Sequence, residues 1–235
     1  MSVSLNSLND NESLLLTRLS EFAPEISEDF KNKKLSELLN DPGIKITDNF
    51  RNFLEECCNT NLKDLVISDF YEDWTGLKIV SFVDSSGNVG FSYYGTDSLD
   101  NIFEALKDIS DDFLTFLFGI SPQLYNALMF FDKVKNRNGN NYLFGHSHGG
   151  AICTFLLLFR DADINSIHLF NPQGLGGLIG KFPINKNKYD VIITDEDGFL
   201  TSGGVDNLKN LQIIYGNVRV AKSKGESIGF LGKHV

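Results

Sequence analysis

Apolar residues recur at helical spacing in the first part of the chain and in short strand-like runs through the rest. From Glu12 to about Cys58 they return every three or four positions, with breaks at Pro24 and at Asp41-Pro42-Gly43. This pattern is typical of short amphipathic helices. We therefore expect residues 1–60 to form a helical N-terminal segment that packs on the sheet.

After this segment, apolar runs of strand length alternate with stretches of helical spacing. Runs at 77–83 and 89–94 flank the turn sequence Asp84-Ser85-Ser86-Gly87-Asn88, which predicts a β-hairpin. Later strands are expected at 142–144, 166–170, 191–193 and 211–215. Strands that alternate with helices favour a mostly parallel sheet with helices on both faces. The sequence thus predicts an α/β fold in a single domain, 1–235, with a β/α core at 74–235.

The most informative stretch is Gly145-His146-Ser147-His148-Gly149, which lies between a strand-like run and an apolar stretch without Gly or Pro. A sharp turn from strand to helix at Gly-x-Ser-x-Gly is a nucleophile elbow, which projects the serine hydroxyl from the sheet. The flanking glycines are needed because a Cβ there would collide with the neighbouring strand or helix. Ser147 is therefore the candidate nucleophile, and a glycine-rich turn without chemistry is the alternative.

A second motif, Gly95-Thr96, comes at the carboxyl end of a predicted strand. Acyl transfer needs preorganised hydrogen-bond donors for the oxyanion, usually the N–H after the nucleophile and one from an earlier strand-to-helix loop. The predicted oxyanion hole therefore consists of Thr96 and the backbone amide of His148. The alternative is that Gly95-Thr96 is an ordinary turn.

Composition narrows the possible partners and compartments. The formal net charge of -10 argues against a nucleic-acid partner and against electrostatic docking on anionic lipid. The three cysteines do not form a disulfide framework and are interpreted as reduced thiols. Neither a cleavable signal peptide nor a stretch of transmembrane length is recognised. We expect a cytoplasmic protein, or one exported without a cleavable signal peptide.

An aromatic-x-Gly-Thr strand end followed by Gly-His-Ser-x-Gly-Gly resembles the class 3 lipase family, including its largely uncharacterised bacterial branch. The resemblance covers about residues 74–234, including Phe170-Asn171-Pro172-Gln173-Gly174 after the elbow helix. It implies an α/β-hydrolase fold and hydrolysis of acylglycerol or phospholipid esters through a Ser-Asp-His triad. The chain departs from the family at Tyr94, where arginine is usual, and at His148, where leucine is usual.

Chain order suggests the other triad members, since in α/β-hydrolases the acid and then the histidine follow the serine. His234 is the only histidine after the candidate acids and would be the base. For the acid, Asp197 is preferred over Asp195 because Asp197-Gly198-Phe199 fits the Asp-x-apolar pattern of the resembled family. The alternatives are a solvated tail histidine and a solvated acidic turn.

The run between the oxyanion loop and the elbow is rich in large apolar residues: Phe113, Phe116, Leu117 and Phe118. They would suit a fatty chain or a lipid surface, although a buried core helix explains them equally well. His146 and His148 could be read as a metal pair, but a third ligand is not evident, so no metal and no cofactor are expected. His168, between Ile167 and Leu169, is interpreted as a packed or capped strand residue.

The expected function is therefore that of a serine carboxylester hydrolase, specifically a lipase or phospholipase A. Its partner would be a lipid or another acyl ester, with transient membrane-surface contact and no nucleic acid. The alternatives are a short-chain esterase, an acyltransferase, or a catalytically silent hydrolase-like interaction module.

Overall fold

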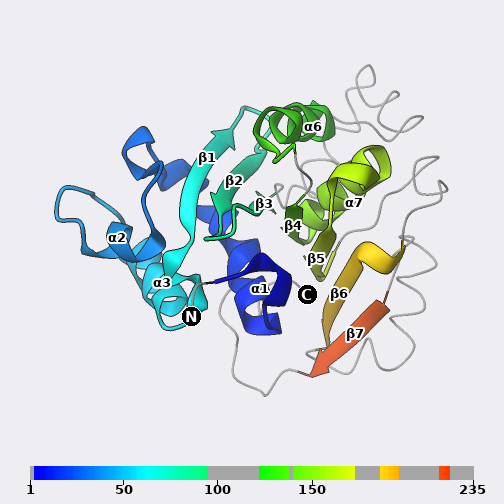
Figure 1. Cartoon of the computed structure of the whole chain (residues 1–235), viewed down its shortest axis with the longest axis horizontal. Coiled ribbons are helices and arrows are strands. Elements are labelled where there is room, and N and C mark those ends of the chain that lie inside the picture. Colours follow the sequence, from blue (N-terminus) through cyan, green and yellow to red (C-terminus); the bar gives the residue numbers. More distant parts are fainter. Residues whose placement is uncertain (1–2, 95–121, 138–139, 173–185, 196–216, 223–235) are drawn as a thin grey trace, which may run out of the picture.

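A computed structural model describes residues 3–94, 122–137, 140–172, 186–195 and 217–222 (Figure 1). Within these residues, seven strands form one sheet in their order along the chain. The strands are β1 Val66–Glu72, β2 Lys78–Val83, β3 Val89–Tyr94, β4 Asn141–His146, β5 Ser166–Phe170, β6 Tyr189–Asp195 and β7 Asn217–Lys222. The pairs β1·β2 and β2·β3 are antiparallel, and every later pair is parallel. The expected α/β fold with a mostly parallel sheet is confirmed.

The described helices fall into an N-terminal group and a later group that lies between the strands. The first group comprises η1 Leu5–Ser7, α1 Asp10–Arg18, η2 Leu19–Glu25, η3 Glu28–Phe30, α2 Leu35–Asn40, α3 Asp48–Cys58 and η4 Asn61–Asp64. The later helices are α6 Pro122–Val134, α7 His148–Arg160, η5 Asp161–Asp163 and η7 Lys186–Lys188. Asn9 and Glu12 form a capping box that begins α1, and the Thr47 hydroxyl caps α3. The expected helical N-terminal segment is confirmed.

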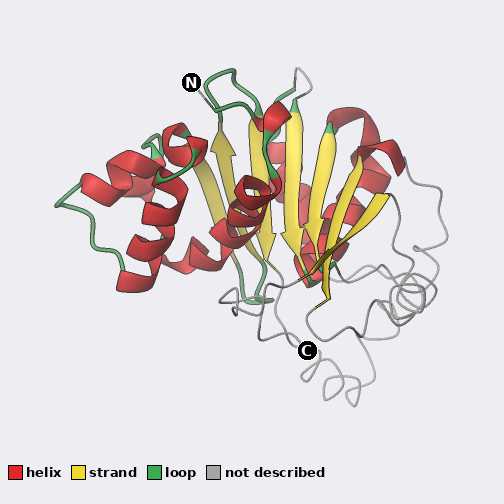
Figure 2. Ribbon diagram, turned by 90° about the horizontal axis from the view of Figure 1, so that it is seen from below, coloured by secondary structure: helices red, strands yellow, loops and turns green. Residues whose placement is uncertain are grey.

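The strand order explains why the sheet needs the N-terminal segment. Right-handed crossovers between strands that follow one another in a parallel sheet place their helices on one face. Helices α6 and α7 accordingly share one apolar core, and the N-terminal helices form a second core. Figure 2 shows helices on both faces of the sheet. Helices α1 and α7 both pack on β3, β4 and β5. The N-terminal segment therefore covers the face that the crossover helices leave open.

Polar contacts as well as apolar packing fix this segment to the sheet. The backbone N–H of Leu5 donates to the buried Asp84 carboxylate at 2.9 Å. The buried Ser92 hydroxyl on β3 accepts from the backbone N–H of Ser20 at 3.1 Å and donates to the carbonyl oxygen of Thr17 at 3.2 Å. Buried polar groups need hydrogen-bond partners, and here each partner lies more than 70 positions away in the chain.

Several elements differ from the sequence-based expectation. The hairpin and the strands expected near 142, 166 and 191 are confirmed, and so is the helix after Ser147. The expected strand at 211–215 lies outside the described residues, and β1, β7 and α6 were not predicted. Strand β1 was missed because Asp69 interrupts its apolar alternation, where a register shift also disturbs the pairing with β2.

The structure describes helices only within the ranges given above. None of the helices there is both long enough and apolar enough to cross a bilayer.

Candidate active site

Ser147 lies at a sharp turn between β4, which ends at His146, and α7, which begins at His148. Its backbone torsions are φ +49° and ψ −120°. Of the described residues other than glycine, only Ser147 and two asparagines have positive φ, and asparagine tolerates this conformation better than serine. The turn is stabilised by bonds from the Ser147 N–H to the Phe170 carbonyl oxygen at 3.2 Å and from the Gly150 N–H to the Ser147 carbonyl oxygen at 2.9 Å. The predicted strand-turn-helix geometry is confirmed.

The two glycines of the motif are required by close backbone contacts. A Cβ on Gly145 would lie 2.5 Å from the carbonyl oxygen of Gly149, in the first turn of α7. A Cβ on Gly149 would lie 2.0 Å from the carbonyl oxygen of Tyr93, on β3. Both distances are far below van der Waals contact, so only glycine allows the strand and the helix to approach this closely.

His148 presents two different groups at the turn. As the first residue of α7, His148 lies in the turn whose backbone N–H groups point out of the helix N-terminus. The Nε2 atom of its half-buried ring lies 2.9 Å from Oε1 of Gln123, in the first turn of α6. The His148 ring thus connects the elbow to the neighbouring helix, which sequence reasoning did not anticipate.

Gln123 belongs to a polar network that ties α6 to the β1–β2 turn. Its Nε2 donates to the carbonyl oxygen of Thr75. On the same helix, Nδ2 of Asn126 donates to Oδ2 of Asp73 at 2.7 Å, while Oδ1 of Asp73 accepts from the Thr75 N–H at 2.8 Å. The amides of Gln123 and Asn126, three positions apart among apolar residues and so on one face of a helix, are the sequence signal that would have pointed to this network.

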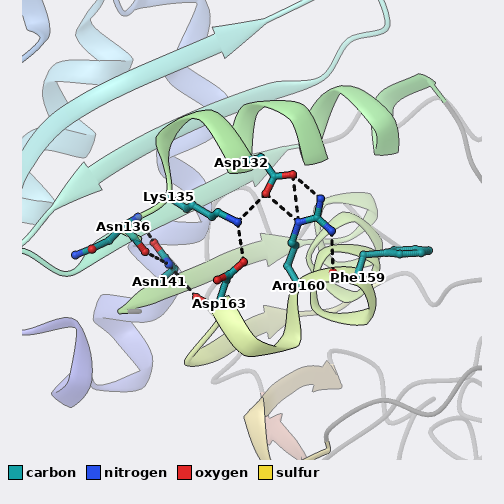
Figure 3. Close-up of polar contacts among 7 residues, drawn as sticks. All are labelled: Asp132, Lys135, Asn136, Asn141, Phe159, Arg160 and Asp163. Atoms are coloured by element: carbon teal, nitrogen blue, oxygen red, sulfur yellow. Dashed lines mark hydrogen bonds and ion pairs between the residues drawn. The ribbon is translucent and has the colours of Figure 1, made fainter. Parts of the chain in front are cut away.

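At the opposite end of the pair, α6 and α7 are joined by charged side chains (Figure 3). Asp132 accepts from Nε of Arg160 at 2.9 Å and from its Nη2 at 2.5 Å. Lys135 donates to Asp132 at 2.9 Å and to Asp163 at 2.7 Å. The hydrogen bonds from Arg160, and then from Lys135, lower the pKa of Asp132 from 3.8 to about 2. The two helices are therefore tied together at both ends.

Of the predicted site residues, the structure describes Ser147 and His148. The others lie outside the described residues: Thr96, Phe113, Phe116, Leu117, Phe118, Asp197 and His234. Strands β3 and β6 end at Tyr94 and Asp195, each two positions before Thr96 and Asp197. Because β3, β4 and β6 are parallel, these two strand ends lie at the same edge of the sheet as Ser147.

A second group of serine, histidine and aspartate lies at the start of β5. Nε2 of His168 is 3.0 Å from the Ser166 hydroxyl, and Nδ1 is 3.4 Å from the Asp190 carboxylate. The His168 ring stacks on Phe144 at 5.1 Å, so the interpretation as a packed strand residue is confirmed. Ser166 lies in an ordinary strand without positive φ, at the end of the strands opposite Ser147. It lacks the exposed turn of an elbow.

The cysteines offer no competing nucleophile next to the elbow. Cys57, Cys58 and Cys153 are free thiols, as expected from their spacing. Cys153 lies on α7 and is fully buried, and this burial raises the pKa of its thiol well above the ordinary value. A thiol that stays protonated and inaccessible is a poor nucleophile.

Comparisons with known proteins give only distant likenesses. No protein-family model matches the chain, and no curated protein matches it. Among solved structures, it is similar to MGS-M1, an α/β-hydrolase enzyme from a Medee basin deep-sea metagenome library, with 12% identity and a TM-score of 0.36 over 68% of this chain and 82% of that one. It is also similar to S-formylglutathione hydrolase from Staphylococcus aureus, with 9% identity and a TM-score of 0.33 over 68% of this chain and 89% of that one. At TM-scores this low, neither likeness assigns an activity to this chain.

Proposed function

We propose that the protein is a serine carboxylester hydrolase that forms an acyl-enzyme on Ser147. The observation that carries the proposal is the strained conformation of this residue, at φ +49° between a parallel strand and the start of a helix. Backbone strain of this kind persists only where the surroundings impose it, and it is concentrated at functional sites. Here Gly145 and Gly149 allow the close contacts that impose it.

The reaction follows from the groups around the serine. The Ser147 Oγ attacks the ester carbonyl carbon while its proton passes to the assigned base, His234, and Asp197 holds the base in the correct tautomer. The oxyanion accepts hydrogen bonds from the His148 backbone N–H and from Thr96. The base then protonates the leaving alcohol as the C–O bond breaks. Water next attacks the acyl-enzyme carbonyl carbon and gives a proton to the base, which returns it to Ser147 Oγ as the acid leaves. The roles of His234, Asp197 and Thr96 rest on chain order and on the class 3 lipase resemblance.

We further propose that the substrate is a lipid ester, as for a lipase or phospholipase A. The support is the apolar run Phe113, Phe116, Leu117 and Phe118, which stands in the sequence between the oxyanion loop and the elbow. Four aromatic and aliphatic side chains could line an acyl pocket or meet a membrane surface. A short-chain esterase or an acyltransferase would use the same catalytic groups with another pocket or acceptor.

Labelling with a fluorophosphonate probe tests the nucleophile. Wild type should be labelled on one serine, and Ser147→Ala should abolish both labelling and ester hydrolysis. Ser166→Ala is a matched control, because it removes a serine that also lies within hydrogen-bond distance of a histidine. The Ser166→Ala variant should be labelled to the same extent as wild type. Equal labelling of wild type and Ser147→Ala would reject the proposal. A wild type that does not react with the probe would favour the catalytically silent interaction module.

A series of p-nitrophenyl esters separates the substrate classes. A lipid hydrolase should have a higher kcat/KM for octanoate to palmitate esters than for acetate, because a longer chain buries more apolar surface in the pocket. A preference for acetate would instead identify a short-chain esterase. Faster transfer to an added alcohol than to water would identify an acyltransferase.

A further inference from the structure

A chain of two side-chain hydrogen bonds reaches the elbow from outside α7. Gln123 donates from Nε2 to the carbonyl oxygen of Thr75, and its Oε1 lies 2.9 Å from Nε2 of His148. Gln123 is only 9% exposed, so water competes little for either contact. We call this arrangement the Thr75–Gln123–His148 bridge.

The bridge determines where the proton of the His148 ring resides. A backbone carbonyl oxygen can only accept, so the nitrogen of the Gln123 amide must face Thr75. The amide oxygen therefore faces His148, and an amide oxygen also only accepts. It follows that Nε2 of His148 carries a proton and donates it to Gln123, which leaves Nδ1 unprotonated in the neutral ring.

We infer that Gln123 is a positioning residue for the oxyanion donor, an inference that rests on the function proposed above. The backbone N–H of His148 is the assigned donor, and as the first residue of α7 it belongs to the part of a helix with the fewest internal hydrogen bonds. The hydrogen bond to Gln123 restrains the His148 side chain, and with it the first turn of α7. Oxyanion donors are effective only when they are held in place before the reaction.

The neighbouring residue Asn126 provides a matched control. It also joins α6 to the β1–β2 turn, through a hydrogen bond to Asp73 at 2.7 Å rather than to a residue of the elbow. Loss of Asn126 should therefore weaken the same helix-to-turn contact without altering His148. If the effect came from weaker packing of α6, both variants would change the His148 tautomer and kcat. If it came from the lost hydrogen bond to His148, only the Gln123 variant should change them.

The decisive experiment compares wild type, Gln123→Met and Asn126→Leu by two readouts. Imidazole ¹⁵N chemical shifts report the tautomer of His148, and p-nitrophenyl ester hydrolysis reports kcat and KM. Wild type and Asn126→Leu should show His148 with the proton on Nε2. Gln123→Met, which keeps the side-chain length but has no amide, should show mixed tautomers and about a tenfold lower kcat at unchanged KM.

Gln123→Glu keeps the test informative if the methionine variant does not fold. A carboxylate at this position accepts from Nε2 and favours the imidazolium, so the midpoint of His148 titration should rise by about one pH unit. An Nδ1–H tautomer in wild type, an unchanged titration in Gln123→Glu, or an unchanged kcat in Gln123→Met would each overturn the inference. A wild type that neither hydrolyses esters nor reacts with the probe would reject the proposed function instead, while the ¹⁵N shifts would still decide whether the bridge exists.

Discussion

Gly149 on α7 lies directly against the carbonyl oxygen of Tyr93 on β3, so close that a Cβ on Gly149 would be 2.0 Å from that oxygen. This contact sets the distance between the first turn of the elbow helix and the carboxyl end of the neighbouring strand. Residue 96, the second assigned oxyanion donor, follows Tyr93 by three positions. Gly149 therefore fixes how closely the elbow helix approaches the end of β3, as well as permitting the turn.

We expect Gly149→Ala to destabilise the protein by about 3 kcal/mol, because neither backbone can move away without disturbing the sheet. Chemical denaturation followed by circular dichroism measures this loss. Gly43→Ala is the control, since its added methyl would meet only a side-chain oxygen of Asp41, at 3.2 Å. Equal stability of the two variants would show that the Tyr93 contact can relax.

The strain at Ser147 has a measurable effect on stability. Glycine adopts φ +49° without the penalty of a Cβ, whereas alanine retains that penalty. Ser147→Gly should therefore be more stable than Ser147→Ala by about 1 kcal/mol, although both should be inactive. Thermal unfolding of the two proteins in one buffer gives the difference. If alanine were the more stable variant, the turn would not be strained.

The Asp132–Arg160 pair predicts a pH dependence of stability. Because the pKa of Asp132 is lowered from 3.8 to about 2 in the folded protein, its carboxylate stabilises the fold above pH 4, and this contribution is lost as the pH falls towards 2. The pair is partly exposed, so we expect Asp132→Asn to cost about 1 kcal/mol at pH 7. The difference from wild type should shrink as the pH falls through about 2 and vanish below it.

Urea denaturation of wild type and Asp132→Asn at several pH values checks this prediction. Asp29→Asn, which removes an exposed carboxylate in η3, serves as the control. A constant difference between wild type and Asp132→Asn from pH 7 to pH 2 would mean that the carboxylate's charge is not what stabilises the helix pair.

The assigned acid, Asp197, and the assigned base, His234, can be tested in one series of variants. Asp197→Asn and His234→Ala should each lower kcat by at least about 10³, since a triad without its acid or base retains only the catalysis of the oxyanion hole and binding. Asp195→Asn is the control for the acid, because Asp195 still belongs to β6 and pairs with β7. Removal of residues 233–235 should match His234→Ala. If His234→Ala and the variant without residues 233–235 both kept full activity, the base would be another residue.

Local features of this protein could be predicted from sequence because their physical causes are local. The elbow depends on the sterics of five consecutive residues, and Gly145 and Gly149 behave as the motif requires. The hairpin depends on the turn from Asp84 to Asn88, where the Asp84 carboxylate accepts from two backbone N–H groups within four positions. Apolar runs flanked by such signals located β2 to β6, but did not locate the edge strand β1, whose pairing with β2 is irregular.

The tertiary structure decided the features that join distant residues. The sequence pattern predicts that the sheet is covered on both faces, but only the tertiary structure assigns one face to the N-terminal segment, because the described crossover helices α6 and α7 pack together on the other face. In the same way, neither hydrophobic spacing nor a motif pairs Gln123 with His148 or Asp132 with Arg160. Such hydrogen bonds form between residues 25 and 28 positions apart only after the helices pack, and local periodicity carries no information about them.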